Sequence, residues 1–348
     1  MRATSLLAAV GALVACSKPP APGAAAVPEA APASSSGGSC GDGRAMTVRF
    51  YDVGQALAVL VELPDGRHVL VDTGDEPHRP GCRDACAASN AHLLSALRAD
   101  LHGAPIDLLW LTHPHSDHIG GAPSVLEAFR VGQYVDDGRA TGKGEVRRAR
   151  RAAEEHGVPV HVVQPGETTV PLASSGDVRL TAIVPPAWPA SCARDPNECS
   201  IGLRIDDCGS SVLLLGDAEH EEEALLDPGG PVTLLQVPHH GSETSTSPAF
   251  LSKARPKYAV VSAGKPGEGM NRDYCHPRAI VVKRLSRVLG GGEAKRTLAA
   301  FDGERCDRAT PEDWVTVPTS ERLWATERDG DVVLETRGDG VFRRVGGE

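Results

Sequence analysis

The chain has 348 residues, of which 41% are hydrophobic and 24% are charged, and its formal net charge is −10. This composition is normal for a globular protein and provides enough apolar side chains for one large or two ordinary domains. Tight binding to nucleic acid is not expected, because it usually requires a basic surface. A metal site can still hold a phosphate group locally.

Residues 1–16 have the features of an export signal. A basic start is followed by an apolar run that is too short to span a bilayer as a helix. Its end, Leu13-Val-Ala-Cys16, resembles a bacterial lipobox, and the alternative is an ordinary secretory signal with a chance cysteine. Residues 17–45 are rich in Pro, Ala, Ser and Gly and are predicted to form a disordered tether. We therefore expect an exported lipoprotein, periplasmic or at the cell surface, anchored in the membrane by lipidation of Cys16.

The cysteine count agrees with export. There are nine cysteines, and the lipobox accounts for one, which leaves an even number in an oxidising compartment. Cys82 and Cys86 lie close together in the sequence, as do Cys192 and Cys199, and either pair could form a short-loop disulfide. A thiolate zinc site at Cys82 and Cys86 is the competing interpretation, and it is disfavoured because two further thiolates at matching spacing are missing.

The body of the chain alternates predicted strands and helices. A helix is expected over 91–98 with Asn90 as its N-cap, and a closing hairpin of residues 322–328 and 332–337 around Asp329-Gly330. The other predicted helices are 124–129, 144–156, 219–226, one beginning near Ser247, and 279–289. The other predicted strands are 47–53, 57–63, 67–72, 106–111, 158–163, 178–184, 201–206, 211–215, 232–237, 258–262 and 297–301.

The predicted helix over 144–156 carries a basic stripe of Arg147, Arg148, Arg150 and Arg151. Such a stripe can form a face for nucleic acid, but it is more often a solvated helix surface. The second interpretation is favoured here.

A cluster of metal-ligand side chains follows the buried strand 106–111. His113, His115, Asp117 and His118 fall within six positions and are followed by Gly120-Gly121. Imidazole nitrogens and carboxylate oxygens suit zinc, and with more carboxylate they also suit manganese or iron. Burying four such groups without a cation would be costly. The cluster therefore predicts a metal site on the loop that leaves the strand.

Several motifs, in this order and spacing, resemble the metallo-β-lactamase superfamily. Within that superfamily the chain resembles the nuclease-like domain of ComEC-type DNA-uptake proteins and their stand-alone relatives. The resemblance implies an α/β (α+β) fold, a four-layer αββα sandwich over residues 46–345. The segments that carry it are 50–55 (FYDVGQ), 69–74 (VLVDTG), 111–121, 212–217 (VLLLGD), 237–242 (VPHHGS), 246–248 and 257–264.

The resemblance also implies roles for individual residues. One metal ion would be held by His113, His115 and Asp217. A second would be held by Asp117, His118, Asp217 and one histidine of the His239-His240 pair, with His240 favoured. Zinc is expected, with manganese or iron possible. The residues expected to take part in catalysis are Asp117, Asp72 (supporting the ligands by hydrogen bonding), His239 (beside His240) and His276 (contacting substrate or protonating the leaving group).

Substrate binding is expected at Asn197 and Ser200, which match an Asn-x-x-Ser pattern, and at Lys265. A helix cap or a surface histidine is an equally good interpretation of His276. The sequence departs from the family at Ala56-Leu57, where relatives usually carry Gly and a small or acidic residue.

The implied function is hydrolysis of a phosphodiester by a dinuclear metal centre, with DNA or a phosphorylated envelope polymer as substrate. Two ions about 3.5–4 Å apart can share and activate a hydroxide. The alternatives are hydrolysis of a carboxylic ester, lactone or β-lactam, and a non-catalytic lipoprotein accessory to DNA uptake. A binding module has no need for a complete dinuclear site, which favours an enzyme.

Overall fold

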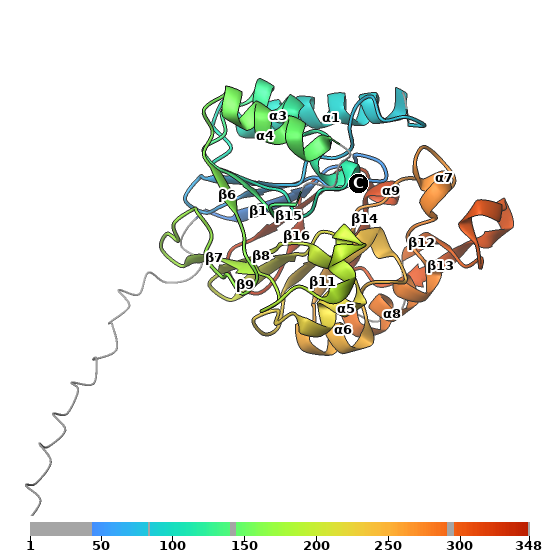
Figure 1. The fold of residues 1–348 in the computed structure, drawn as a ribbon. Coiled ribbons are helices and arrows are strands. Elements are labelled where there is room, and N and C mark those ends of the chain that lie inside the picture. The colour runs from blue at the N-terminus through green and yellow to red at the C-terminus, as the bar shows by residue number, and fades with distance from the viewer. Residues whose placement is uncertain (1–43, 83, 140–143, 291–295, 347–348) are drawn as a thin grey trace, which may run out of the picture. The chain divides into compact units, whose positions relative to one another are not determined.

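Two β-sheets lie face to face and helices cover the outer face of each, which gives four layers in the order αββα (Figure 1). The predicted fold class is therefore confirmed. The computed structural model describes residues 44–82, 84–139, 144–290 and 296–346. The predicted signal peptide, the lipidation site Cys16 and residues 17–43 of the predicted tether lie outside the described residues. No helix in the described ranges has the length and apolar character needed to cross a membrane.

The first sheet has eight strands, antiparallel on one side and parallel on the other. In spatial order they are β16 (Arg343–Arg344), β15 (Val332–Thr336), β1 (Met46–Phe50), β2 (Val59–Glu62), β3 (His68–Val71), β4 (Leu108–Trp110), β5 (Tyr134–Asp136) and β6 (Val160–Val162). Its outer face is covered by α1 (Asp84–Leu101), α3 (Ala122–Ala128) and α4 (Glu145–Glu155).

The second sheet has six strands and mirrors this arrangement. In spatial order they are β14 (Leu323–Ala325), β11 (Tyr258–Val261), β10 (Leu234–Gln236), β9 (Ser210–Leu214), β8 (Gly202–Asp207) and β7 (Val178–Ile183). Outside it lie α5 (His220–Leu225), α6 (Pro248–Ala254) and α8 (Ala279–Leu289), with a ribbon of β12 (Arg296–Phe301) and β13 (Trp314–Thr319) beside α8.

Alternation of side chains along the central strands builds the layers. In β4, Leu108 and Trp110 belong to the core between the sheets, whereas Leu109 packs against the outer helices. A strand buried on both faces needs such a continuous apolar run. The indole Nε1 of Trp110 also donates a hydrogen bond to the carbonyl of Ile201 at 2.8 Å, which ties the first sheet to the start of β8.

Two local predictions are wrong. The closing hairpin does not form, because β14 pairs with β11 in the second sheet and β15 with β1 in the first, with the short α9 (Thr326–Asp329) between them. Gly330, with φ of +64°, ends α9 instead of forming a hairpin turn. Asn90 is not an N-cap either, since α1 begins at Asp84 and the alanine-rich turn before Asn90 is already helical.

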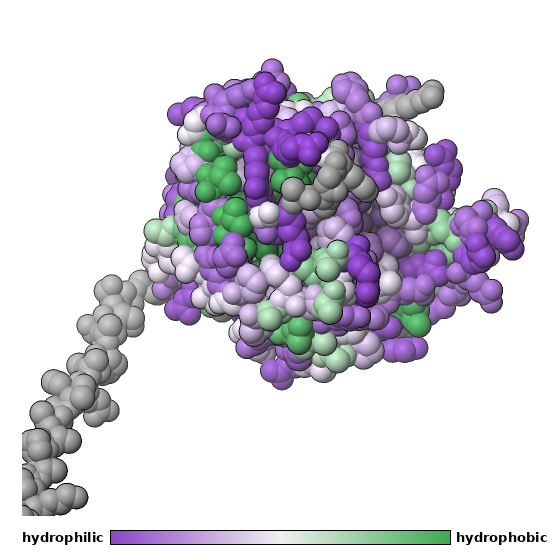
Figure 2. Space-filling view, viewed as in Figure 1, coloured by the Kyte–Doolittle hydropathy of each residue, from purple (hydrophilic) through white to green (hydrophobic). Residues whose placement is uncertain are grey.

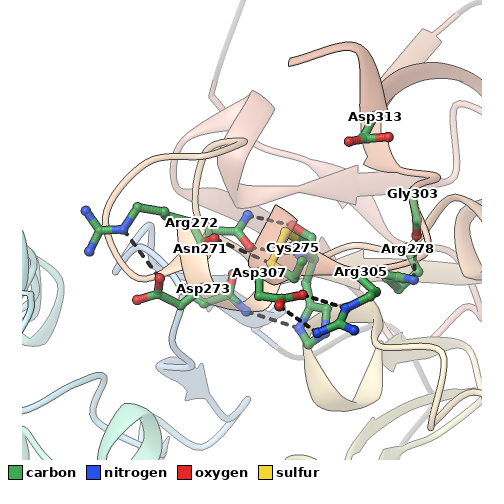
Figure 3. Close-up of a disulfide and its surroundings, with 12 residues drawn as sticks. Asn271, Arg272, Asp273, Cys275, Arg278, Gly303, Arg305, Asp307 and Asp313 are labelled. Carbon is green, nitrogen blue, oxygen red and sulfur yellow. Dashed lines mark hydrogen bonds and ion pairs between the residues drawn. A yellow bond between two sulfur atoms is a disulfide. The ribbon is translucent and has the colours of Figure 1, made fainter. Parts of the chain in front are cut away.

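The two predicted short-loop disulfides, Cys82–Cys86 and Cys192–Cys199, are present, so the zinc interpretation of the first pair is wrong. A third disulfide, Cys275–Cys306, joins the end of α7 (Asn271–Tyr274) to a short 3-10 turn (Figure 3). The alternating sequence pattern gave no sign of this third link, which spans 31 positions. Cys208 is disulfide-bonded as well.

Acidic partners neutralise most of the basic stripe on α4. Arg150 pairs with Asp136 and Arg148 with Glu76, and Arg151 pairs with Glu155 on the same helix. Hydrophilic side chains dominate the surface near α3 and α4 (Figure 2). These pairings agree with the preferred interpretation of the stripe as a solvated surface.

Candidate metal centre

The candidate ligands sit on loops that leave the carboxyl ends of three strands. The loop after β4 continues into α2 (Ser116–Ile119) and carries the first four, Asp217 follows β9, and His239-His240 follow β10. Parallel neighbours end at the same edge of a sheet, so these loops converge. Close packing explains two glycines: a Cβ on Gly121 would collide with the carbonyl oxygen of Thr73, and one on Gly216 with the hydroxyl of Thr112.

Four buried residues form the tightest group. One ligand atom from each of them lies within 4.8 Å of the others, and the group is Asp117, His118, Asp217 and His240. The Nε2 atom of His118 is 3.1 Å from Asp217 Oδ1. The Nε2 atom of His240 is 3.7 Å from both Asp117 Oδ2 and Asp217 Oδ2. Two imidazoles and two carboxylates suit zinc, manganese or iron.

The buried polar atoms of this group show that a cation fits. Within the described ranges, His118 Nε2, Asp217 Oδ1 and His240 Nε2 are buried and have no hydrogen-bond partner. Leaving such atoms unsatisfied costs about 1–3 kcal/mol each. A divalent cation among them would satisfy all three.

The remaining predicted ligands, His113 and His115, lie next to this group. His113 Nε2 lies 3.1 Å from His115 Nδ1 and 3.9 Å from Asp217 Oδ2. His239 Nε2 is also 3.8 Å from that oxygen. Asp217 therefore lies close to His113 as well as to the tight group, and the structure brings together the six residues predicted to hold metal.

Three histidines of the site are each oriented by a polar partner on Nδ1, the ring nitrogen opposite the one that faces Asp217. His118 Nδ1 donates to Asp72 Oδ2 at 2.7 Å, and His240 Nδ1 donates to the carbonyl of Ser262 at 2.7 Å. His239 Nδ1 lies 2.8 Å from Glu219 Oε1. Such outer contacts fix the tautomer and turn the free nitrogen toward the centre. Asp72 thus contacts a candidate ligand, as the resemblance implies.

Glu219 was not among the predicted site residues. Its place two positions after Asp217, where the chain turns toward α5, was the one available signal. A carboxylate at the start of a helix is common for unrelated reasons, so that signal was too weak to assign a role.

The charges of the cluster favour the ionised carboxylates that metal ligands require. Burial alone would raise the pKa of Asp217, but His118 and His240 hold that pKa well below its usual value. Burial would likewise raise the pKa of Asp117, and the nearby imidazole of His240 lowers it. Burial would lower the pKa of His239, whereas the carboxylates of Asp217 and Glu219 raise it.

A cavity of about 300 Å³ opens onto the cluster. Of the three residues predicted to bind substrate, Asn197 lines it. Ser200 is buried behind it, where its backbone N–H donates to Glu222 and its hydroxyl accepts from the backbone N–H of Asp217 at 3.3 Å. Lys265 lines a different cavity of about 440 Å³. The structure therefore brings one of the three to the metal cavity.

His276 lies beside the cluster and is 7% exposed. Its ring centroid is 5.3 Å from that of His239, and its Nδ1 lies 3.4 Å from Gln55 Nε2. Burial lowers the pKa of His276 well below its usual value. It is therefore neither a surface residue nor, with α8 beginning at Ala279, the cap of that helix.

Residues 51–265 match the model of the Metallo-beta-lactamase superfamily. The chain therefore belongs to this superfamily, whose members are generally metal-dependent hydrolases.

Two relatives support a narrower likeness. The chain is 32% identical over 251 residues to ComE operon protein 3 of Bacillus subtilis, covering 69% of this chain and 30% of that protein. It is 30% identical over 250 residues to Recombination protein 2 of Haemophilus influenzae, covering 71% of this chain and 27% of that protein. The chain thus spans less than a third of the length of either relative. Among solved structures, human tRNase Z, short form, matches 62% of this chain and 91% of its own at 16% identity, with a TM-score of 0.39.

Proposed function

We propose that this protein hydrolyses phosphodiesters with two divalent metal ions. The observation that carries the proposal is the position of Asp217, which has four histidines within 3.1–3.9 Å: His118 and His240 of one proposed ligand set, His113 of the other, and His239. A carboxylate placed between two sets of ligands is the arrangement that a dinuclear centre needs. The proposed ligands are His113, His115 and Asp217 for one ion, and Asp117, His118, Asp217 and His240 for the other.

The chain's own residues would organise the reaction around these ions. Asp72, Ser262 and Glu219 orient the histidines, as described above, and the buried cluster forms one end of the cavity. Two bound ions would polarise a phosphoryl oxygen and lower the pKa of the attacking water. Asn197 lines the cavity and His276 lies beside His239, and we propose that both contact the substrate.

Two observations support a phosphodiester as the substrate. The names of two relatives, Recombination protein 2 of Haemophilus influenzae and Competence protein ComA of Neisseria gonorrhoeae, refer to recombination and competence. The cavity also carries an arginine, which suits an anionic substrate. Since the chain spans less than a third of these relatives, the transport of DNA is not part of the proposal. Three buried atoms of the cluster have no hydrogen-bond partner among the described residues: His118 Nε2, His240 Nε2 and Asp217 Oδ1. They favour bound metal ions and therefore oppose a purely non-catalytic accessory role.

The test is a panel of chromogenic substrates offered to metal-loaded protein. We expect turnover of a bis-aryl phosphodiester that is abolished by a chelator and restored by zinc or manganese. If the loaded protein opens a lactone, an ester or a β-lactam but leaves the phosphodiester intact, the proposal is wrong in its substrate. If it turns over none of them, a non-catalytic role replaces it.

The proposal includes export and lipid anchoring through Cys16. It rests on the lipobox-like Leu13-Val-Ala-Cys16 and on the disulfides of the domain, which form in oxidising compartments. Cys16→Ala should move the protein from the membrane fraction to the soluble fraction. A wild-type protein that is already soluble and begins at another residue would contradict the anchor.

A further inference from the structure

Two loops from distant parts of the sequence meet beside the metal cavity. Arg79 lies just before α1 and Tyr274 ends α7, 195 positions later, yet Arg79 Nη2 donates a hydrogen bond to Tyr274 Oη at 2.7 Å. Both side chains line the same cavity as Asp117 and Asp217. Neither residue belongs to the predicted site.

The guanidinium of Arg79 is held in a fixed place relative to the metal loop. Its Nη1 donates to Asp75 Oδ2 at 2.7 Å. The other oxygen of Asp75 accepts from the hydroxyl of Ser116, which neighbours Asp117. An arginine held by such a chain of contacts loses little freedom when it binds a ligand.

The same guanidinium keeps donors for a ligand. Arg79 has five N–H groups, and within the described residues it makes two side-chain hydrogen bonds, to Asp75 and Tyr274. Its side chain is 20% exposed, on the cavity side. Three N–H groups are therefore available, enough for a two-pronged contact with phosphate oxygens.

Disulfides brace both loops. Cys82, three residues after Arg79, is linked to Cys86 in the first turn of α1. Cys275, directly after Tyr274, is linked to Cys306 (Figure 3). The side-chain amide of Asn271 also donates to the carbonyls of Gly264 and His276, both at 2.6 Å. The contact between Arg79 and Tyr274 is thus supported from both sides.

Arg79 supplies a positive charge at the metal cavity, next to the carboxylates of the buried cluster. Among the described residues that line the cavity, Arg79 is the only arginine or lysine. Four carboxylates also line it: Glu76, Asp117, Glu145 and Asp217. A cation at this place attracts an anionic group and would add little for a neutral ester or lactam.

We propose that Arg79 and Tyr274 form an anion subsite that binds phosphate oxygens of the substrate beside the metal centre. This inference rests on the proposed function, and it adds that the enzyme distinguishes charged phosphodiesters from neutral esters through these two side chains. The simpler alternative is that Arg79 only stabilises the fold through its ion pair with Asp75.

Arg79→Met tests the subsite, and Arg272→Met is the matched control. Arg272 lies on α7, pairs with Asp273 (Figure 3) and has a side chain that is 61% exposed. It is not among the residues that line the metal cavity. For Arg79→Met we expect kcat/KM for a bis-aryl phosphodiester to fall about 10- to 100-fold, the loss typical of a charge-assisted contact. Hydrolysis of a neutral aryl ester should change less than about threefold, and the control should match wild type.

A second measurement does not depend on turnover. The Kd for inorganic phosphate, measured by calorimetry on protein with its full metal content, should rise about tenfold or more in Arg79→Met and by less in Tyr274→Phe. Unchanged phosphate affinity with unchanged metal content would overturn the subsite. So would an equal loss for the charged and neutral substrates.

These two measurements also separate the two proposals. If wild-type protein cleaves no phosphodiester but its phosphate affinity depends on Arg79, the subsite stands and the proposed function fails. If it cleaves phosphodiesters equally well with and without Arg79, the function stands and the subsite fails.

Discussion

His118 and Asp72 are joined by a 2.7 Å hydrogen bond, which leaves the other ring nitrogen of His118 3.1 Å from Asp217. A carboxylate can only accept, so Nδ1 of His118 carries the proton and Nε2 is free for a metal ion. The opposite oxygen of Asp72 accepts from the backbone N–H of Thr112 at 2.8 Å. This carboxylate therefore sets the tautomer of a candidate ligand.

Asp72→Asn should weaken metal binding without unfolding the protein. The amide oxygen would accept from the backbone N–H of Thr112, and the amide nitrogen would face His118. Because the amide nitrogen can only donate, Nδ1 of His118 would have to accept, and the ring proton would move to the nitrogen that faces the metal. Asparagine also tolerates the left-handed backbone at this position, where φ is 57°. We expect metal affinity to fall about 10- to 100-fold, measured by competition with a chromophoric chelator.

Asp107→Asn is the control for that experiment. Asp107 accepts a hydrogen bond from the backbone N–H of His68 at the far end of β3 and β4. Its replacement should leave metal affinity unchanged. Equal losses in the two variants would mean that Asp72 acts through stability and not through His118.

The position of Asp217 predicts how metal content responds to mutation. Asp217→Ala should lower the metal content of both proposed ligand sets, because this carboxylate lies close to histidines of each. His240→Ala should mainly remove the ion of the set that contains Asp117 and His118. Elemental analysis of dialysed proteins gives the metal per chain. Two retained ions in Asp217→Ala would rule out a shared ligand.

Asp137 should make stability fall as the pH rises. Burial raises its pKa from 3.8 to about 7, and the charge of Asp136 adds to the shift, while Arg139 and Arg150 oppose it. The unfolded chain releases this proton first, so between pH 4 and 7 the folded state binds more protons and rising pH favours unfolding. The contribution lost over this range is about 4 kcal/mol.

Asp137→Asn removes that dependence. Relative to wild type, the variant should gain stability steadily between pH 4 and 7 and change little above pH 8. Urea unfolding with the disulfides intact, at pH 4.5, 6 and 8.5, measures the difference. A constant difference across these pH values would show that the folded carboxyl titrates normally.

Substitution of Trp110, in the core between the sheets, should strongly lower the free energy of unfolding. Trp110→Phe removes the hydrogen bond to the carbonyl of Ile201 and leaves that buried oxygen unsatisfied. We expect a loss of about 2–4 kcal/mol in the free energy of unfolding. Trp188, which is partly buried against the same core, is the control, and Trp188→Phe should cost less than about 1 kcal/mol. Similar losses in both would contradict the bridging role of Trp110.

The sequence predicts the centre of the site well because its signals are local. The ligands after β4 fall within six positions, and Asp217 and His239-His240 follow apolar strands whose ends meet in a parallel sheet. These segments carry the resemblance to the metallo-β-lactamase superfamily, and that resemblance implies that Asp217 and His240 join the ligands after β4. The fold class follows from the same motifs.

The outer part of the site depends on tertiary contacts that no local pattern contains. Arg79 contacts Tyr274, which lies 195 positions later in the chain. Disulfides hold the loops that carry these two residues, and the spacing of the cysteines does not determine how all of them pair. Lys265 lies near these loops in sequence but lines another cavity. The hairpin prediction failed for a similar reason, since the choice of sheet for β14 and β15 is made by pairing with β11 and β1.

Metal-dependent turnover tests the central claim most directly. Metal-free protein should be titrated with zinc or manganese while the hydrolysis of a bis-aryl phosphodiester and the bound metal per chain are recorded together. We predict that turnover rises as the second equivalent binds and that it is lost in Asp217→Ala. A wild-type protein that binds two equivalents and still leaves every phosphodiester intact would contradict the account.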